Sequence, residues 1–164
     1  MAEEKIYSWE DINDLCDSLI DQINHEFDVI VPILRGGLIP GSMLAYRYFN
    51  KFGPIEVQPI IWQTRDNNKK EIEKLIDVFH NNSNILIMDD LLDSGLTFYQ
   101  IEEELNNIGI DFKRVIENNW NINFAVLMQN VSAEYDNPKI GNIIAGEIID
   151  KESDPRWIRF PWEN

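Results

Sequence analysis

The stretch that most constrains the fold of this chain lies near its middle, at residues 85–97, and reads ILIMDDLLDSGLT. It begins as a short apolar run with β-branched residues, which is typical of a buried strand. The run ends in two carboxylates, Asp89 and Asp90. A third carboxylate, Asp93, opens a turn of small residues before a helical pattern begins. A strand, a turn and a helix in this order indicate an α/β sheet.

The polar groups of this stretch suit a ligand that carries both hydroxyls and a phosphate. The carboxylates of Asp89 and Asp90 can accept hydrogen bonds from sugar hydroxyls or hold a divalent cation. Backbone N–H groups at a turn and a helix N-terminus bind phosphate, and residues 93–97 offer them. The alternative is an ordinary strand end, because glycine after a strand often only makes a turn.

Composition and charge exclude several classes of protein. We expect residues 1–164 to form one domain, because 164 residues with 44% hydrophobic content can bury a core. No apolar run reaches membrane-spanning length, and the first ten residues lack a signal-peptide pattern. The single cysteine, Cys16, falls on an apolar helical stripe and is expected in the core. These features predict a cytoplasmic protein without membrane contact.

The formal net charge is −15, which argues against binding nucleic acid through a basic surface. It also makes long-range attraction of an anionic substrate unfavourable, so local cations must bind such a substrate. Arg35, Lys69 and Lys70 fall in candidate loops and are expected to supply this charge.

Hydrophobic periodicity predicts helices that alternate with strands, and hence an α/β fold with a mostly parallel sheet flanked by helices. Ser8 and Asp11 are expected to form a capping box at the first helix, and Gly109 is expected to cap the last. Strands are predicted over 28–34, 55–61, 84–88 and 123–128, further helices over 38–50, 71–79 and 97–108, a polar loop over 63–70, and irregular structure after 131.

A second glycine-containing motif follows the first predicted long strand. Arg35, Gly36 and Gly37 come directly after residues 28–34. The two glycines allow close approach of a ligand, and the arginine fork matches phosphate oxygens. The alternative is a plain turn with an exposed arginine. Ligands of parallel sheets bind outside the carboxyl ends of the strands, where both motifs are expected.

Together the two motifs resemble those of the type I phosphoribosyltransferases. Residues 85–97 match the phosphoribosyl-pyrophosphate motif of this family. That motif consists of an apolar strand, two acids and two apolar residues, followed by D-[ST]-G-x-T. Residues 31–41 resemble the pyrophosphate loop of the family. In that loop the peptide before the arginine is often cis, here Leu34–Arg35. The resemblance implies the fold of that family, with a small irregular C-terminal hood built from the N-terminal segment and about 131–164.

Within the family the chain looks most like the xanthine-guanine and hypoxanthine enzymes. Trp9-Glu10, residues 68–71 (NKKE) and residues 157–163 (WIRFPWE) resemble three of their motifs. The resemblance implies Mg²⁺-dependent transfer of 5-phosphoribose from phosphoribosyl pyrophosphate to xanthine, guanine or hypoxanthine, with release of pyrophosphate. It also implies a role in purine salvage and assembly into a dimer or tetramer.

The same resemblance implies a role for each matched residue. Asp89 and Asp90 would hold the ribose hydroxyls with Mg²⁺ nearby, and Asp93 would act as base toward a purine ring nitrogen. The other substrate contacts implied are Arg35, Gly36 and Gly37 on pyrophosphate, Lys70 closing over it from a mobile loop, Ser94, Gly95, Leu96 and Thr97 on the 5′-phosphate, Trp157 stacked on the base and the Ile158 backbone at its edge.

Two departures leave alternatives open. The family places a lysine after the fourth strand to read the 6-oxo group, but residues 126–130 read VLMQN, so Gln129 or else Asn130 is expected to offer an amide. Lys70 stands where an arginine is usual and lacks its bidentate fork. A phosphoribosyltransferase for a different base, or a regulatory protein that senses phosphoribosyl pyrophosphate, therefore remain alternatives. Trp162 is expected to anchor the C-terminal tail.

Overall fold

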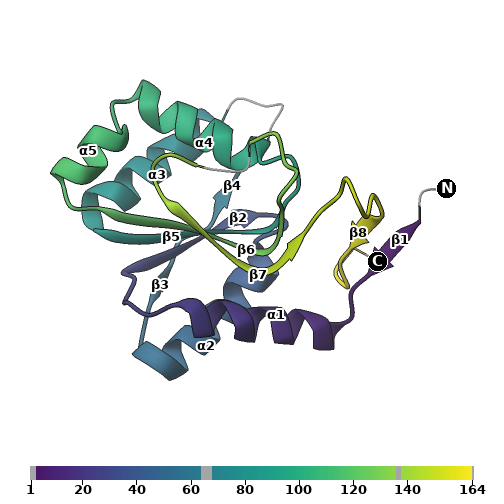
Figure 1. Cartoon of the computed structure of the whole chain (residues 1–164). Coiled ribbons are helices and arrows are strands. Elements are labelled where there is room, and N and C mark those ends of the chain that lie inside the picture. The colour runs from purple at the N-terminus through teal and green to yellow at the C-terminus, as the bar shows by residue number, and fades with distance from the viewer. Residues whose placement is uncertain (1–2, 64–67, 136–137, 164) are drawn as a thin grey trace.

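The computed structural model describes residues 3–63, 68–135 and 138–163, and its helices and strands alternate as predicted (Figure 1). In chain order the elements are β1 (Glu4–Ile6), α1 (Trp9–Gln22), β2 (Val29–Leu34), α2 (Leu38–Phe52), β3 (Glu56–Val57), β4 (Ile60–Ile61), α3 (Lys69–Asn81), β5 (Asn84–Leu92), α4 (Leu96–Asn107), α5 (Phe112–Glu117), β6 (Asn121–Asn130), β7 (Asn142–Ile149) and β8 (Trp157–Arg159).

The main sheet has six strands, in the order β3-β2-β5-β6-β7 with β4 also paired to β2. All of these pairs are parallel. Helices α1 and α2 lie on one face of the sheet, and α3, α4 and α5 lie on the other (Figure 1). The predicted α/β fold with a parallel sheet between helices is therefore confirmed. A separate two-stranded parallel sheet joins β1 to β8, beside the main sheet.

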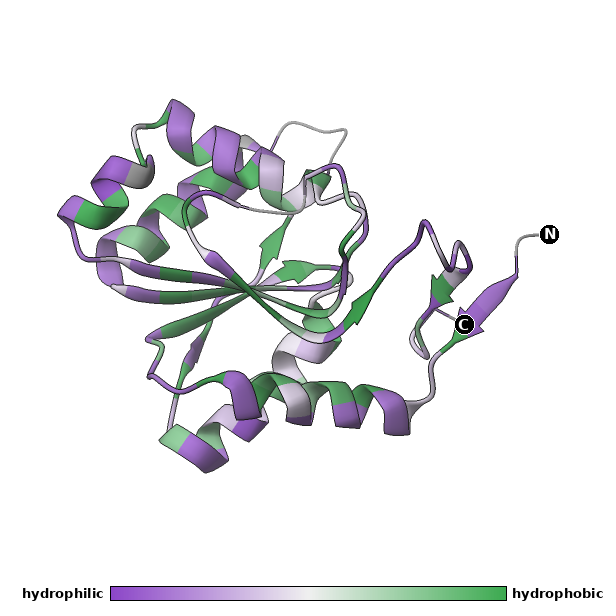
Figure 2. Cartoon of the chain, viewed as in Figure 1, coloured by the Kyte–Doolittle hydropathy of each residue, from purple (hydrophilic) through white to green (hydrophobic). Residues whose placement is uncertain are grey.

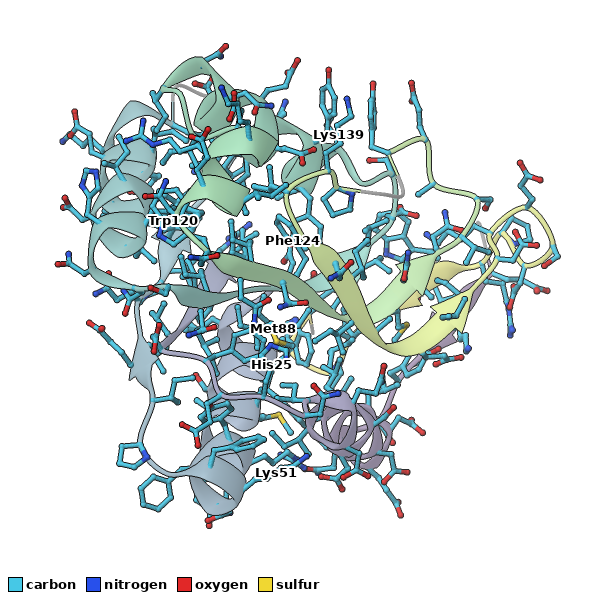
Figure 3. All side chains as sticks on the ribbon, turned by 60° about the vertical axis from the view of Figure 1, so that its left-hand side comes forward. His25, Lys51, Met88, Trp120, Phe124 and Lys139 are labelled. Carbon is cyan, nitrogen blue, oxygen red and sulfur yellow. The ribbon has the colours of Figure 1, made fainter. Side chains whose placement is uncertain are left out.

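The central strands are buried on both faces, which explains their nearly continuous apolar sequences. Figure 2 shows this hydrophobic centre between helices whose outer faces are largely hydrophilic. Phe124, labelled in Figure 3, packs with α3 and α4 on one face of the sheet, including Phe79 and Phe98. Met88 packs with α1 and α2 on the other face, in the core that also holds Cys16. The predicted core position of Cys16 is confirmed, and burial raises the pKa of its thiol to about 11.

Local sequence signals set two helix ends as predicted. The Ser8 hydroxyl accepts a hydrogen bond from the Asp11 N–H at 3.1 Å, and the Asp11 carboxylate accepts one from the Ser8 N–H at 2.7 Å. This is the capping box that begins α1. After α4, Gly109 adopts a φ of 82°, which an L side chain rarely tolerates. Both termini are therefore determined by residues within a few positions of the helix.

Several of the predicted boundaries are wrong, and the strand predicted over 55–61 is two short strands, β3 and β4. Helix α3 begins at Lys69, so the last two residues of the polar loop predicted over 63–70 are helical, and residues 64–67 lie outside the described part. Strand β5 continues to Leu92, so it includes the acidic pair. The region after 131 is not irregular throughout, because β7 joins the main sheet and β8 pairs with β1. The hydrophobic pattern of β7 is weak in the sequence, because most of its residues are half-exposed and the Gly146-Glu147 pair interrupts its apolar residues.

Candidate active site

The register of the sheet brings the carboxyl ends of its long strands to one edge. Pro32 of β2 pairs with Met88 of β5, so the residues after each of them continue side by side. Gln129 of β6 pairs with Leu92 of β5 on one side and with Ile148 of β7 on the other. The segments that follow β2, β5, β6 and β7 therefore meet at the edge where parallel sheets bind ligands.

The loop after β2 meets the acidic end of β5. The Leu34–Arg35 peptide is cis, as predicted. Gly36 lies so close to Asp90 that a Cβ on it would overlap the Asp90 carboxylate. Arg35 and Gly36 line a cleft of about 1190 Å³ together with Asp89 and Asp90. The structure thus brings the two predicted motifs into one cavity.

The two carboxylates of this cleft share an environment that disfavours their charge. Asp89 accepts a hydrogen bond from the Asp90 N–H at 3.0 Å, and Asp90 accepts one from the Leu91 N–H at 2.8 Å. Burial raises the pKa of both, to about 6 for Asp90, and for Asp89 the neighbouring Asp90 charge raises it further. Hydroxyl donors or a cation bound to the two carboxylates would offset the free-energy cost of burying their charged forms.

The turn after β5 forms a small cavity of about 90 Å³, lined by Asp93, Ser94, Gly95, Leu96 and Thr97 among others. Gly95 has a φ of 77°, and a Cβ there would overlap the backbone carbonyl of Tyr135. The Tyr135 N–H donates to the Ser94 carbonyl at 3.0 Å. Binding of a phosphate by the N–H groups of this turn and of the first turn of α4 stays a prediction.

The segment that carries Trp157 is fixed by pairing with the N-terminus. The Trp157 N–H donates to the Glu3 carbonyl at 2.9 Å, and Ile158 is buried in the core of the α1 side. The Trp157 side chain is 57% exposed. Its indole ring lies under the ammonium of Lys151, which is 5.4 Å from the ring centroid. The same ammonium is 3.0 Å from a carboxylate oxygen of Asp93.

No sequence motif singles out Lys151. It lies two residues beyond β7, in a stretch that matches no motif, so only the pairing of β7 with β6 could reveal its place. Lys151 brings the predicted base Asp93 and the predicted stacking residue Trp157 into one cluster.

The two amides predicted to read the base have different surroundings. Asn130 is buried, and its amide donates to the Asp93 carbonyl at 3.0 Å. Its oxygen accepts from the Lys151 N–H at 3.1 Å and from the Ser132 hydroxyl at 2.7 Å. Asn130 thus holds three backbone segments together. Gln129, half-buried beside it on β6, stays a prediction for a base contact.

Lys70 is not brought to the cleft. It lies exposed in the first turn of α3 and lines neither of the two cavities described above. Trp162 stacks on Phe160 at 4.8 Å and contacts Trp9 at 5.9 Å, in line with the predicted anchor, but it also lines the large cleft.

Neither metal clusters nor membrane helices appear in the part of the chain that the structure describes. Its residues include no group of three or more histidine, cysteine, aspartate or glutamate side chains that could hold a metal ion. None of its helices is long and apolar enough to cross a membrane.

Sequence and structure comparisons place this chain in a family. Residues 3–158 match the phosphoribosyl transferase domain, so the chain belongs to the phosphoribosyltransferases, and its fold and motifs are those of type I. The xanthine-guanine phosphoribosyltransferase of Chromohalobacter salexigens is 27% identical over 160 residues, which are 95% of this chain and 82% of that protein.

Solved structures show the same fold at lower identity. A hypothetical protein from Neisseria gonorrhoeae with bound ppGpp has a TM-score of 0.69 and 20% identity, and the match covers 100% of this chain and 91% of that one. The xanthine-guanine-hypoxanthine phosphoribosyltransferase of Helicobacter pylori has a TM-score of 0.65 and 21% identity, over 99% and 94% of the two chains.

Proposed function

We propose that this protein transfers 5-phosphoribose from phosphoribosyl pyrophosphate to a 6-oxopurine base and releases pyrophosphate, as in purine salvage. The observation that supports this most is the single cleft shared by Arg35-Gly36 and Asp89-Asp90, beside the Ser94–Thr97 turn. The cleft offers Arg35 for pyrophosphate, carboxylates for ribose hydroxyls and N–H groups for the 5′-phosphate. These three groups follow one another in the same order along phosphoribosyl pyrophosphate.

The roles of the residues follow from the charge that develops in the reaction. Breaking the bond between ribose C1 and pyrophosphate creates an oxocarbenium-like centre and a highly charged leaving group. The chain contributes by positioning and by electrostatic stabilisation. Arg35 would hold the leaving pyrophosphate, and Asp93 would take the proton from the purine ring nitrogen that attacks C1.

Asp89 and Asp90 fit a Mg²⁺ site, because they are adjacent carboxylates whose charge is disfavoured by burial. Mg²⁺ binds one or two carboxylates and completes its shell with phosphate oxygens and water, so two protein ligands are sufficient. When bound, Mg²⁺ would neutralise part of the charge on the pyrophosphate group.

Thermal unfolding with phosphoribosyl pyrophosphate and Mg²⁺ tests the donor site. A ligand that binds only the folded state stabilises it by roughly 2.7 kcal/mol at one hundred times its Kd. Pyrophosphate release with a panel of bases then tests the reaction. A donor that leaves the melting temperature unchanged at millimolar concentration would refute the site assignment.

A regulatory role is the second candidate, and the Neisseria relative with bound ppGpp favours it. The large cleft could bind a polyphosphorylated nucleotide through the same Arg35 loop. The two functions differ in turnover. Binding of phosphoribosyl pyrophosphate or ppGpp without pyrophosphate release for any base would support the regulatory protein over the enzyme.

A further inference from the structure

Strand β8, which carries Trp157 and Ile158, lies outside the main sheet and pairs with β1 (Figure 1). The Glu3 carbonyl accepts from the Trp157 N–H at 2.9 Å, and the Arg159 carbonyl accepts from the Tyr7 N–H at 3.0 Å. Two strands by themselves are only marginally stable in water, so other parts of the fold must hold this pair in place. The position of Trp157 therefore depends on what fixes β1.

Glu147, on strand β7 of the main sheet, makes directional contacts with the N-terminal segment. One of its carboxylate oxygens accepts from the Lys5 ammonium at 3.1 Å, and the other accepts from the Tyr7 hydroxyl at 2.9 Å. The Lys5 ammonium also lies 4.8 Å from the centroid of the Tyr7 ring. In the register of the small sheet, Lys5 is the partner of Ile158. One carboxylate thus links the main sheet to the strand beside β8.

The preceding residue, Gly146, brings β7 close to α1, the helix that follows β1 in the chain. A Cβ on Gly146 would come within 2.9 Å of the Leu15 carbonyl oxygen. The Gly146 carbonyl accepts from the Ser18 hydroxyl at 3.2 Å. Two consecutive residues of β7 therefore hold α1 and β1. This explains why a glycine and a carboxylate interrupt the apolar residues of that strand.

The contacts of Glu147 fix geometry more than they stabilise the fold. Apolar packing of Ile158 holds β8 against the core of the α1 side, but such packing is not directional. The side chains of Lys5 and Glu147 are 31% and 36% exposed, and ion pairs this exposed contribute little to stability. Tyr7 is buried, so its hydroxyl requires the acceptor that Glu147 provides. Loss of the carboxylate is therefore expected to shift β1 and β8 in a chain that still folds.

We propose that Glu147 is a positioning residue for the base side of the site. Through Lys5 and Tyr7 it sets the place of β1, and through β1 it sets the place of Trp157 and of the Ile158 backbone. Small shifts matter at such a site, because a misplacement of about 1 Å can cost on the order of 100-fold in rate. This inference rests on the proposed function, which assigns the base to β8.

Steady-state kinetics of Glu147→Ala test this role. For the 6-oxopurine that the wild type turns over fastest, we expect the KM to rise about 10-fold. The kcat and the KM for phosphoribosyl pyrophosphate should stay nearly unchanged, because only binding of the base is weakened. Glu147→Gln keeps an acceptor for the Tyr7 hydroxyl and should restore part of the loss. In a double variant with Trp157→Ala, the rise in KM should be smaller than the product of the two single effects, because both changes act on the same ring.

Amide hydrogen exchange tests the position of β8 without any substrate. Exchange over residues 157–159 should be faster in Glu147→Ala than in the wild type, while exchange in β5 should be unchanged. Glu117→Ala is the matched control, because it removes the carboxylate of another ion pair, with Lys113 on α5, and should change neither. If Glu147→Ala does not fold, Tyr7→Phe removes only the hydroxyl and should give the same pattern to a smaller extent.

Three results would overturn the positioning role of Glu147. These are unchanged exchange in β8, equal rises in the KM for base and donor, or fully multiplicative effects with Trp157→Ala. Pyrophosphate release by the wild type reports on the reaction itself. Its absence for every base, alongside faster exchange in β8 of the variant, would refute only the proposed reaction.

Discussion

The donor side and the base side of the candidate active site are built in different ways. The donor side consists of two contiguous segments, the loop 35–37 after β2 and residues 89–97, which include the end of β5 and the turn after it, on neighbouring central strands. The proposed base side gathers Asp93, Asn130, Lys151 and Trp157, which lie at or just beyond the ends of four different strands, β5, β6, β7 and β8. A contiguous loop carries its chemistry in its own sequence, whereas a gathered site depends on which strands are neighbours.

This difference makes separate predictions for the two sides. Changes on the donor side should alter the affinity for phosphoribosyl pyrophosphate, and changes on the base side should alter the kinetics of the base. Asp93 lies between the two, because it follows β5 and also pairs with Lys151.

The largest effect is expected for Asp93→Asn. Asparagine keeps the shape of the side chain but cannot take a proton, so kcat should fall by about 10²–10⁴-fold. Affinity for phosphoribosyl pyrophosphate should be nearly retained, which calorimetry can check. Asp77→Asn, on the exposed face of α3, serves as the matched control with normal turnover. Turnover close to wild type in Asp93→Asn would show that Asp93 has only a structural role.

On the donor side, Gly36→Ala should weaken binding of phosphoribosyl pyrophosphate. The added Cβ would overlap the Asp90 carboxylate, so the loop or the acid must move. Overpacking of this kind costs about 1–3 kcal/mol, which corresponds to roughly 5- to 150-fold in affinity. Gly109→Ala is the control, because its φ of 82° strains the backbone far from the cleft. Unchanged affinity for phosphoribosyl pyrophosphate in Gly36→Ala would show that the close contact between Gly36 and Asp90 does not matter for binding.

On the base side, Trp157→Ala should raise the KM for the base and leave that for the donor nearly unchanged. Stacking of a base on an aromatic ring contributes about 1–3 kcal/mol, or roughly 5- to 150-fold in affinity. Initial rates measured at varied base and varied donor separate the two constants. If both constants rise equally, Trp157 supports the whole cleft through β8, and the proposed division into two sides is wrong.

The smallest effect concerns stability and follows from the raised pKa of Asp90, about 6. The folded chain retains this proton at a pH where the unfolded chain has released it, so the contribution to stability is complete at low pH. It is lost as pH rises from about 4 through 6. Asp90→Asn should therefore flatten this decline in the free energy of unfolding, measured by denaturant titration without ligand. A parallel pH dependence in both proteins would contradict the raised pKa.

Most of the fold and the donor side could be predicted from local sequence. The Ser8 capping box, the apolar strands and the glycine at 109 act through neighbours within a few residues, and the structure agrees. Strand β7 was missed because it is a half-exposed edge strand whose place is determined by pairing with β6. Helix α5 was missed because it has only six residues and little periodicity.

The sequence alone determined the class of this protein, because the 85–97 and 31–41 motifs each place their charges and glycines within one short stretch of sequence. The tertiary structure alone decided that Lys151 and Asn130 contact Asp93. Lys151 reaches Asp93 because β7 pairs with β6 in a register that aligns Asn130 with Ile149. That register depends on contacts between residues far apart in the chain, and no local pattern encodes them.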